Sequence, residues 1–346
     1  MLGVALVGAG RVGGIRAGVV RNSIDARLRV VADVERGRAE ALAQVAGAEA
    51  LADWRAAVAH RDVAIVIVAT PTKFHREIAI ASLEAGKHVL CEKPLGRSAE
   101  EAEEMVEAAQ RAQRILWTGF NYRYLAHVRK AKELIMAGKL GPLYFLRSRY
   151  GHGGRPSYET AWCTDAELSG GGVLQEQGIH ILDQVRFLLG EPLQILAQVQ
   201  RYFWNFPAVE DNCFCLVKTK AGQIAQLHVS WTQWINVLEM EIYGRDGYLR
   251  LEGRDGYYGP PRLIWGSRKP DHSRPSEEHF QFPAVDDSWE REWCEFLNCV
   301  RAETNLSANG LDGLRAQQMV DAAYRSARSQ SWVEIHSPET QTVRQP

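Results

Sequence analysis

The chain opens with a short apolar run, GVALV, that continues directly into the pattern GAGRVG at residues 8–13. A tight turn needs a glycine such as Gly8, close approach of a phosphate to the backbone needs one such as Gly10, and close packing of helix on strand needs one such as Gly13. Asp33 ends the next apolar run, about twenty residues further on. Because a strand, this turn, a helical pattern and an acid occur together, we predict a dinucleotide-binding unit with the phosphates at the helix N-terminus.

Short β-branched runs alternate with helical patterns over the first part of the chain. Strict alternation implies right-handed crossovers and a parallel sheet covered on both faces, and such strands are expected to be apolar throughout. We therefore predict an α/β Rossmann domain over residues 1–120. Its expected strands are 3–8, 28–33, 63–70, 88–93 and 115–120, and its expected helices end near residue 22 or span 36–46, 75–85 and 98–112.

Strand patterns then follow one another from residue 143 onward, with the turn signals AG and RDG between some of them. This predicts an α+β domain over residues 121–346, which holds a large, mostly antiparallel open sheet and serves substrate binding and oligomerisation. Its expected strands are 143–150, 194–203, 212–220, 223–231, 238–244 and 248–253; its expected helices are 125–137, 173–189, 287–303 and 309–328; residues 266–279 are expected to form a loop.

Composition limits the kinds of partner. With 24% charged residues and a formal net charge of −1, the chain has no global field to attract nucleic acid or an anionic membrane. The apolar N-terminal run is short and lacks a basic leader, so we expect no signal peptide, no membrane span and a cytoplasmic protein. No Cys/His cluster has the spacing of metal ligands, so we predict no metal. The expected partner is a small molecule or another protein.

Asp33 indicates which dinucleotide binds. Its carboxylate would accept hydrogen bonds from the adenosine ribose hydroxyls and repel a 2′-phosphate, which favours NAD over NADP. Arg36 and Arg38 lie just downstream and would soften that preference. The predicted cofactor is therefore NAD, with NADP less favoured, and the expected contacts from the glycine pattern are Gly8, Gly10, Arg11, Val12 and Gly13.

The segment GGGVLQEQGIHILD, residues 170–183, places polar residues inside a helical pattern. Glu176, His180 and Asp183 follow one another at steps of four and three, which lie on one face of an α-helix. We expect Glu176 to fix the tautomer of His180 and to stabilise the imidazolium formed when His180 takes a proton. A structural histidine capped by a carboxylate is the alternative. The three glycines are expected to let the chain approach cofactor or substrate closely.

The motifs ATPTKFH (69–75), AGKHVLCEKPL (85–95) and GFNYRY (119–124) precede the glycine-led segment, in this order, after the first glycine pattern. Together they resemble the Gfo/Idh/MocA family of NAD(P)-dependent sugar and polyol oxidoreductases over nearly the whole chain. The resemblance implies that Lys93, of the EKP motif, and His180 are the catalytic pair. Relatives usually carry Asp four residues before this histidine, where this chain has Glu176. The stretches RYGHGGRPSYE, SWTQW and EIYGRDGYL are similar to a subgroup tied to surface-polysaccharide or nucleotide-sugar metabolism.

The end of the fourth parallel strand carries Lys93. Pro94 favours extended backbone there, and open α/β sheets bind ligands at the carboxyl ends of their strands. An ammonium at this place would donate to the reacting oxygen and stabilise alkoxide charge, whereas a solvated lysine in a Lys-Pro turn is the alternative. Glu92 would either orient Lys93 or be exposed. Cofactor contacts are also expected from Thr70, Pro71, His75, Glu92 and Lys93, although His75 is equally well explained as a helix-start residue.

Polar side chains expected to bind substrate come from two stretches. Asn121 and Arg123 follow the last strand of the first sheet, where they would line an interdomain cleft or form a polar seam between the domains. The glycine-rich stretch around residues 149–158 offers donors suited to a polyhydroxylated or phosphorylated substrate. These donors are Arg149, His152, Arg155 and Tyr158.

Taken together, the patterns predict an NAD-dependent oxidoreductase that transfers a hydride between nicotinamide and a hydroxyl or ketone of a sugar, polyol or nucleotide sugar. Two alternatives stay open: a glycoside hydrolase that uses bound NAD for transient oxidation, and a non-catalytic, cofactor-sensing regulator on the same scaffold. The second sheet has too few helices to cover both faces, which would leave Leu227, Val229 and Trp231 to be buried by another copy. We therefore predict a homodimer or homotetramer.

Overall fold

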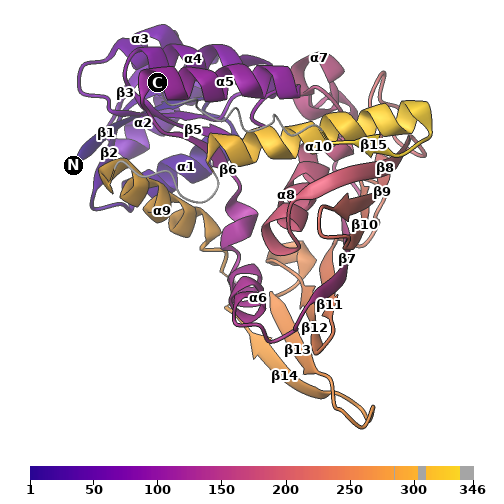
Figure 1. Ribbon diagram of the computed structural model, residues 1–346. Coiled ribbons are helices and arrows are strands. Elements are labelled where there is room, and N and C mark those ends of the chain that lie inside the picture. The colour runs from indigo at the N-terminus through magenta and orange to yellow at the C-terminus, as the bar shows by residue number, and fades with distance from the viewer. Residues whose placement is uncertain (284, 303–308, 336–346) are drawn as a thin grey trace, which may run out of the picture.

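The computed structural model describes residues 1–283, 285–302 and 309–335, and Figure 1 shows their elements arranged around two separate sheets. A six-stranded parallel sheet from the N-terminal part is followed by a nine-stranded, mostly antiparallel sheet. The predicted fold class, a Rossmann domain followed by an α+β unit with a large open sheet, is confirmed. Within the described ranges, no helix is both long enough and apolar enough to cross a membrane.

The first sheet has the strand order β3-β2-β1-β4-β5-β6. Its central strand β4 is apolar and fully buried, as expected for a strand between two helical layers. The order reverses between β1 and β4, so the carboxyl ends of these two strands flank the crevice where such sheets bind ligands. The strands are β1 (Leu2–Val7), β2 (Ala26–Ala32), β3 (Glu49–Leu51), β4 (Ile65–Val68), β5 (His88–Glu92) and β6 (Leu116–Gly119).

The helices of the first unit connect consecutive strands, and α5 shows how the sequence fixes their ends. Ser98 Oγ accepts a hydrogen bond from the backbone N–H of Glu101, and the Glu101 carboxylate accepts one from the backbone N–H of Arg97, 2.8 Å away. These side chains satisfy amides that the first turn leaves without partners. The helices are α1 (Arg11–Arg21), α2 (Arg36–Ala46), α3 (Trp54–Ala59), η1 (Thr72–Phe74), α4 (His75–Glu84) and α5 (Ala99–Ala112).

The second sheet has the order β14-β13-β12-β11-β7-β10-β9-β8-β15. β7 and β10 run parallel, and the other neighbouring strands of this sheet run antiparallel. The strands are β7 (Leu143–Gly151), β8 (Pro192–Gln200), β9 (Asn212–Thr219), β10 (Ile224–Ser230), β11 (Val237–Gly244), β12 (Gly247–Glu252), β13 (Arg262–Ser267), β14 (Ser276–Gln281) and β15 (Val333–Glu334).

Helices from the C-terminal part join the two units. Helix α10 packs against α5 and β6 of the first unit and against α8 and β8 of the second, and α9 packs on α1 (Figure 1). Both helices come from beyond residue 120, so the division into residues 1–120 and 121–346 stays a prediction. The remaining helices are η2 (Asn121–Tyr124), α6 (Ala126–Met136), η3 (Tyr158–Thr160), η4 (Trp162–Thr164), α7 (Ala166–Ser169), η5 (Leu174–Gly178), α8 (Ile179–Leu188), η6 (Gly256–Tyr258), α9 (Ser288–Ala302) and α10 (Gly310–Ser329).

The sequence patterns miss β3, α3, β13, β14 and β15. Residues 266–279 are not a continuous loop, because β13 extends to Ser267 and β14 begins at Ser276, with the two strands paired antiparallel. Most side chains of β14 are exposed, so this edge strand has no apolar alternation to reveal it. The end of the helix expected to reach residue 303 lies outside the described residues.

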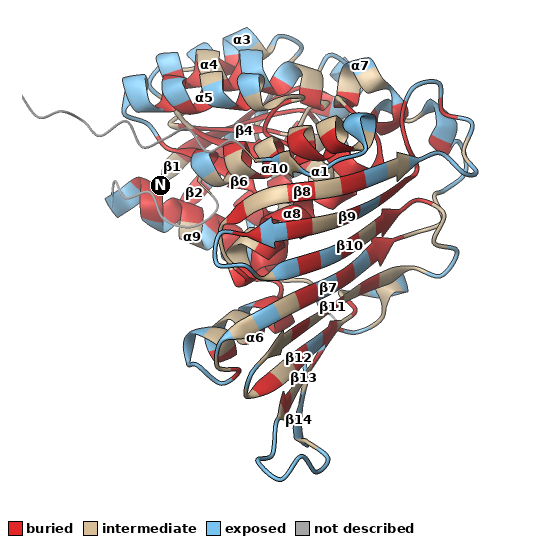
Figure 2. Cartoon of the chain, turned by 45° about the vertical axis from the view of Figure 1, so that its right-hand side comes forward, coloured by how far each residue is buried: buried red, intermediate tan, exposed pale blue. Residues whose placement is uncertain are grey.

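The second sheet does leave one face open, but the sequence prediction of which residues lie there is wrong. Leu227, Val229 and Trp231 are buried within the chain, because η5 and α8 pack on their face of the sheet. The opposite face carries no helix in Figure 2, which shows its strands in front with alternating bands of burial. On that face the ring of Phe214 stacks on His228 at 4.1 Å.

Candidate active site

The turn after β1 has the geometry of a phosphate cradle. Gly8 has a φ of +101°, and a Cβ at Gly13 would lie 1.9 Å from the carbonyl oxygen of Gly8, so neither position accepts a side chain. A Cβ at Gly10 would meet nothing within 4 Å, so this glycine borders open space. No side chain caps the start of α1 at Gly10, and its first turn carries no acid. The amides of this helix N-terminus are therefore directed at a place where an anion fits.

Asp33 lies at the end of β2, next to this turn. Its Oδ2 accepts a hydrogen bond from the backbone N–H of Ala9 at 2.7 Å, and its Oδ1 accepts one from that of Glu35 at 2.8 Å. These bonds fix the carboxylate beside the glycine turn. Arg36 forms an ion pair with Glu40 at 2.7 Å, and that pairing directs its guanidinium along its own helix.

Thr70 follows β4 on the other side of the same crevice. Its hydroxyl oxygen is buried, and no group in the described part of the chain bonds to it. An orphaned polar atom at the carboxyl end of β4 is a suitable partner for a ribose or amide group. Together with the open space at Gly10 and the acid at the end of β2, it makes the residues present a good fit for a dinucleotide.

Lys93 follows β5 and reaches across to η5 of the second unit. Its Nζ donates a hydrogen bond to the carbonyl oxygen of Glu176 at 2.7 Å and lies 3.2 Å from the carboxylate Oε1 of the same residue. Burial raises the pKa of Glu176, but the charges of Lys93 and His152 outweigh burial and hold that pKa below its ordinary value. The structure thus joins two of the predicted catalytic residues.

The predicted pairing of Glu176 with His180 is wrong. Residues Leu174–Gly178 form a turn of π-helix before α8 begins. A π-turn has i→i+5 hydrogen bonds, so a step of four residues no longer places two side chains one above the other as it does in an α-helix. Glu176 turns toward Lys93 instead.

His180 lies deep beside an aromatic ring. Its imidazole stacks on Tyr122 with centroids 4.0 Å apart and an angle of 11° between the planes. Its Nδ1 is buried, and among the described residues no group bonds to it. Burial, followed by the charges of Lys93 and Arg254, lowers the pKa of His180 well below its ordinary value. The imidazole is therefore neutral near pH 7, with an unsatisfied nitrogen that a ligand could bond.

Comparison with known proteins agrees with this geometry over both units. A family model described as "Oxidoreductase family, NAD-binding Rossmann fold" matches residues 2–120, and a second, described as "GFO/IDH/MocA C-terminal domain", matches residues 128–250. The two matches together span most of the chain, including the first sheet and strands β7 to β11 of the second. The chain belongs to the Gfo/Idh/MocA oxidoreductase family. The predicted enzyme class and the predicted NAD cofactor are confirmed at this level.

Three relatives within the Gfo/Idh/MocA family are named as dehydrogenases of a sugar or a polyol. The chain is 29% identical to D-glucoside 3-dehydrogenase of Escherichia coli, covering 96% of this chain and 97% of that protein. It is 26% identical to inositol 2-dehydrogenase of Rhizobium meliloti, covering 95% and 98%. It is 25% identical to levoglucosan dehydrogenase of Pseudarthrobacter phenanthrenivorans, covering 86% of each. The resemblance to a nucleotide-sugar subgroup stays a prediction.

Solved structures of the Gfo/Idh/MocA family show the same arrangement of the two sheets. Levoglucosan dehydrogenase in complex with NADH and levoglucosan superposes with a TM-score of 0.88 at 25% identity, covering 97% of this chain and 100% of that one. Aldose-aldose oxidoreductase from Caulobacter crescentus, complexed with glycerol, has a TM-score of 0.86 at 24% identity. The second likeness is evidence of fold alone.

Glu92 of the EKP motif is neither exposed nor paired with Lys93. It accepts a hydrogen bond from Arg16 Nε at 2.7 Å, and Arg16 Nη2 lies 2.7 Å from Glu292 of α9. All three side chains are buried. Burial raises the pKa of Glu292 to about 7, although Arg16 opposes this shift. The network ties α1, the end of β5 and α9 together beneath the residue that carries the ammonium.

His75, expected to contact the cofactor or to start a helix, is buried between two loops of the crevice. Its Nδ1 lies 2.9 Å from the carbonyl oxygen of Pro94, and its Nε2 lies 2.9 Å from that of Thr70. Burial lowers its pKa, although both carbonyls oppose this. Both ring nitrogens face the protein's own backbone, and His75 is the first residue of α4, as the helix-start alternative expects. A direct contact of His75 with the cofactor stays a prediction.

Asn121 and Arg123 form a buried seam, so their prediction as substrate-binding residues is wrong and the alternative holds. The amide of Asn121 donates to Ser288 Oγ at 2.9 Å. Arg123 pairs with Asp183 and with Asp312 of α10, and its side chain is 4% exposed. Asp183 therefore belongs to this seam and not to a proton-handling stripe with Glu176. The seam fastens η2 to helices α8, α9 and α10.

The four donors predicted around β7 do not all reach the site. Arg149 lies on the open face of the second sheet, where it pairs with Glu239 at 2.6 Å. Because β7 extends to Gly151, strand alternation turns Arg149 away from Tyr150 and from the crevice, and its prediction is wrong. His152, Arg155 and Tyr158 do lie together: the His152 ring packs on Tyr158, and Arg155 lies over the Tyr158 ring at 5.1 Å.

The three glycines before η5 pack against the protein itself, so the expectation that they approach a ligand is wrong. A Cβ at Gly170 would lie 2.7 Å from the Cβ of Arg97, and one at Gly171 would lie 2.2 Å from the Tyr324 hydroxyl. A Cβ at Gly172 would lie 2.2 Å from the carbonyl oxygen of Glu210. These contacts set the start of η5 and, through it, the position of Glu176.

Sequence reasoning misses a phenol cluster beside His180. The hydroxyls of Tyr122 and Tyr150 share a hydrogen bond at 2.6 Å, and the Tyr122 hydroxyl accepts one from Arg254 at 2.5 Å. Burial, followed by Tyr122, raises the pKa of Tyr150 well above its ordinary value. Side chains alternate between buried and exposed along β7, and this alternation predicts that Tyr150 is buried. No local pattern marks Arg254, which comes from the turn after β12.

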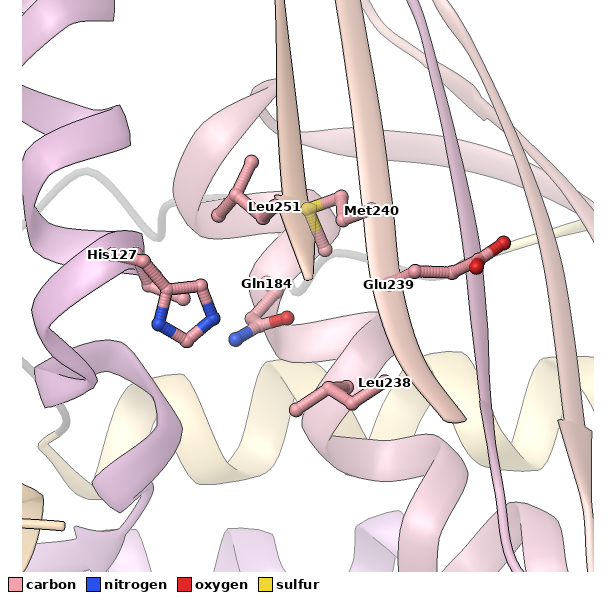
Figure 3. A pocket seen from close by; sticks show the side chains of 7 residues that line it. His127, Gln184, Leu238, Glu239, Met240 and Leu251 are labelled. Carbon is pink, nitrogen blue, oxygen red and sulfur yellow. The ribbon is translucent and has the colours of Figure 1, made fainter. Parts of the chain in front are cut away.

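A small internal cavity lies apart from these groups. It is lined by side chains of α6, α8, β11 and β12, and Figure 3 shows the His127 ring and the Gln184 amide directed toward one another across it. Burial lowers the pKa of His127 to about 4. Among the described residues, no cluster of three or more His, Cys, Asp or Glu could hold a metal ion. Neither Lys93, Glu176 nor His180 lines this cavity, so it is separate from the candidate active site.

Proposed function

We propose that this NAD-dependent oxidoreductase oxidises a secondary alcohol on a sugar or polyol ring, or reduces the corresponding ketone, with Lys93 transferring the proton and Glu176 holding Lys93 in place. The contact of Lys93 Nζ with the carbonyl oxygen and with the carboxylate Oε1 of Glu176 carries the proposal. Bound NAD would accept or return the hydride. In the oxidation, the C–H bond gives its electron pair as hydride, and the hydroxyl proton passes to Lys93 in its neutral amine form, which becomes the ammonium paired with Glu176.

Glu176 would keep Lys93 in place through its charge, and the proton would pass from Lys93 to solvent after each turnover. A carboxylate whose pKa is held below its ordinary value stays charged and is suited to holding an ammonium, and the charge of His152, from the loop after β7, also acts on it. His180 would bind the substrate oxygen as a neutral imidazole, because burial opposes its protonation. In this assignment His180 orients the reacting carbon, and Lys93 is the acid and base.

The substrate is proposed to be a ring of hexose size with several hydroxyls, as the names of the relatives suggest. His152 and Arg155 would bind these hydroxyls, and Thr70, Pro71, Arg11, Val12 and Asp33 would border the cofactor. A screen of NADH formation over inositols, aldoses, glycosides and nucleotide sugars tests the proposal. Net NADH formation from a simple sugar separates it from an NAD-dependent glycosidase, and any turnover separates it from a regulator.

We further propose a homodimer or homotetramer, in the cytoplasm, formed through the open face of the second sheet. Arg147 with Glu241 and Arg149 with Glu239 give that face alternating charges, to which a second copy is complementary. Light scattering at micromolar concentration tests this, with Phe214→Asp as the disrupting variant. A monomeric wild-type chain would contradict it.

A further inference from the structure

Aromatic side chains are exposed at one end of the second sheet. Tyr202, Phe203 and Trp234 are 65%, 61% and 63% exposed, and we refer to these three residues as the aromatic shelf. They come from loop 201–211, between β8 and β9, and loop 231–236, between β10 and β11. Single exposed apolar residues are ordinary on a protein surface, whereas a contiguous group marks an interaction site.

The shelf belongs to a loop that is held rigidly. Asp211 is fully buried, and its carboxylate accepts hydrogen bonds from the backbone N–H groups of Tyr202, Phe203 and Trp204 at 2.9, 2.9 and 3.0 Å. The indole of Trp204 donates to the carbonyl oxygen of Trp231 at 2.8 Å, which ties the two loops together. The fold therefore holds these rings in one arrangement while leaving them in solvent.

Two rings of the shelf, Phe203 and Trp234, meet edge to face. Phe203 and Trp234 have centroids 4.9 Å apart and planes at 81°, and Phe203 meets Trp204 at 90°. Edge-to-face contact leaves ring faces free. The face of an aromatic ring carries negative partial charge, which suits the C–H groups on one side of a pyranose ring.

The shelf is continuous with the candidate active site. The ends of β7, β9 and β10 lie side by side, because Ser230 pairs with both Gly151 and Asn212, and Figure 2 shows the loops gathered at this end. The chain leaving β7 runs beneath the shelf, since a Cβ at Gly153 would lie 3.1 Å from the Trp234 ring. His152, the preceding residue, is among those whose charges act on Glu176, after Lys93 and together with Arg11.

We propose that the aromatic shelf binds a second sugar ring of a neutral glycoside or oligosaccharide whose reacting ring lies at Lys93. The inference rests on the proposed function and adds that the preferred substrate has at least two rings. The second ring would stack on Phe203 and Trp234, while the first reaches the crevice along His152. The shelf thus acts as a specificity site and takes no part in the chemistry.

The polar groups bordering the shelf favour a sugar over an apolar protein surface or a lipid. Asn205 and Gln233 flank the exposed rings, and within the described ranges their side-chain amides bond to no other group. Amides that both donate and accept are suited to sugar hydroxyls. A second copy of this chain is the competing occupant, and the test below distinguishes the two.

The experiment compares a free hexose with a disaccharide that carries the same reacting ring, using wild type, Phe203→Ala and Trp234→Ala. We expect each variant to lose about 5- to 10-fold in kcat/KM for the disaccharide, mainly through KM, as stacking contacts contribute to binding and not to the chemical step. The value for the free hexose should change less than about 2-fold. Phe203→Tyr should restore the disaccharide activity. Tyr144→Ala, at the opposite end of β7, is the matched control and should leave both substrates unaffected.

Equal losses for both substrates would show that the rings only support the loop, and no loss for either would show that nothing stacks there. A change from oligomer to monomer in light scattering would assign the shelf to a contact between copies. Each of these results would overturn the inference while leaving wild-type turnover, and with it the proposed function, intact. If the wild-type enzyme turned over neither substrate, binding of a non-reacting oligosaccharide by titration calorimetry would still be expected to weaken in Trp234→Ala, and unchanged binding would contradict the shelf.

Discussion

Lys93 Nζ is held by two oxygens of one residue, the carbonyl oxygen of Glu176 at 2.7 Å and its carboxylate Oε1 at 3.2 Å. The two residues come from opposite units, since Lys93 follows β5 and Glu176 lies in η5. Their contact spans the crevice beside the glycine turn. The proposed proton transfer therefore depends on how the π-turn presents Glu176.

Replacing Glu176 by Gln should reduce kcat by about 10² while NAD binding is retained. The amide keeps the shape of the side chain but gives Lys93 no charge to pair with, so the amine is held less firmly toward the reacting oxygen. The kcat of Glu176→Asp should lie between those of the wild type and Glu176→Gln, because the backbone carbonyl still holds Lys93 while the carboxylate is withdrawn by one methylene. Single-turnover kinetics with fluorescence titration of NADH measures both effects. Wild-type kcat in Glu176→Gln would assign the carboxylate a structural role.

Replacing Asp33 by Ser should shift the cofactor preference toward NADP. The carboxylate opposes a 2′-phosphate by charge, and its removal also frees the backbone N–H groups of Ala9 and Glu35. The ratio of the two dissociation constants should change by at least about 10-fold, with binding of NAD weakened. The variant Glu40→Gln, which releases Arg36 from its ion pair, should add to the gain for NADP. Preference for NADP in the wild-type protein would contradict the role given to Asp33.

The buried network at Arg16 should make stability depend on pH through Glu292. Burial raises the pKa of Glu292 to about 7 in the folded protein, so between pH 4.5 and 7 the folded state binds more protons than the unfolded state. The stability due to this group is present below pH 4.5 and is lost as the pH rises to 7. As the pH rises from 5 to 8, the free energy of unfolding of Glu292→Gln should therefore come to exceed that of the wild type by up to about 3 kcal/mol, measured by urea unfolding. A difference that does not change with pH would contradict the assignment.

His127 gives the opposite sign and serves as a comparison in the same experiment. Burial lowers the pKa of His127 to about 4, so the unfolded state binds the extra proton between pH 6.5 and 4. Its contribution is present above pH 6.5 and is lost as the pH falls toward 4. Between pH 6.5 and 4, the free energy of unfolding of His127→Phe should therefore fall by up to about 3 kcal/mol less than that of the wild type. Equal acid sensitivity in variant and wild type would show that the ring is hydrated in its cavity.

Most elements of the first unit, though not the short β3 and α3, could be predicted from the sequence because its longer strands and its glycine turn carry local signals. The apolar runs, the pattern at residues 8–13 and Asp33 each reflect contacts made within about thirty residues. The EKP motif likewise lies at the end of a strand that its own composition reveals. These features place Lys93 at the crevice without knowledge of the second unit.

The pairing within the site could not be predicted in the same way. A π-turn at Leu174–Gly178 has no distinct apolar period, so the steps from Glu176 to His180 and Asp183 suggest a single α-helical face. The partner of Asp183 is Arg123, and the partner of Glu92 is Arg16, at separations of 60 and 76 residues. Such contacts depend on how the two units pack, which no local spacing encodes.

Deuterium transfer to NAD tests the central claim most directly. A panel of carbon-deuterated hexoses and inositols is incubated with NAD, and the NADH formed is examined by mass spectrometry for wild type and for Lys93→Met. The account predicts NADH carrying one deuterium from the sugar carbon with the wild-type enzyme, and a rate lower by about 10³ for Lys93→Met with NAD still bound. Binding of NAD without label transfer to it from any sugar of the panel, or equal transfer by Lys93→Met, would contradict it.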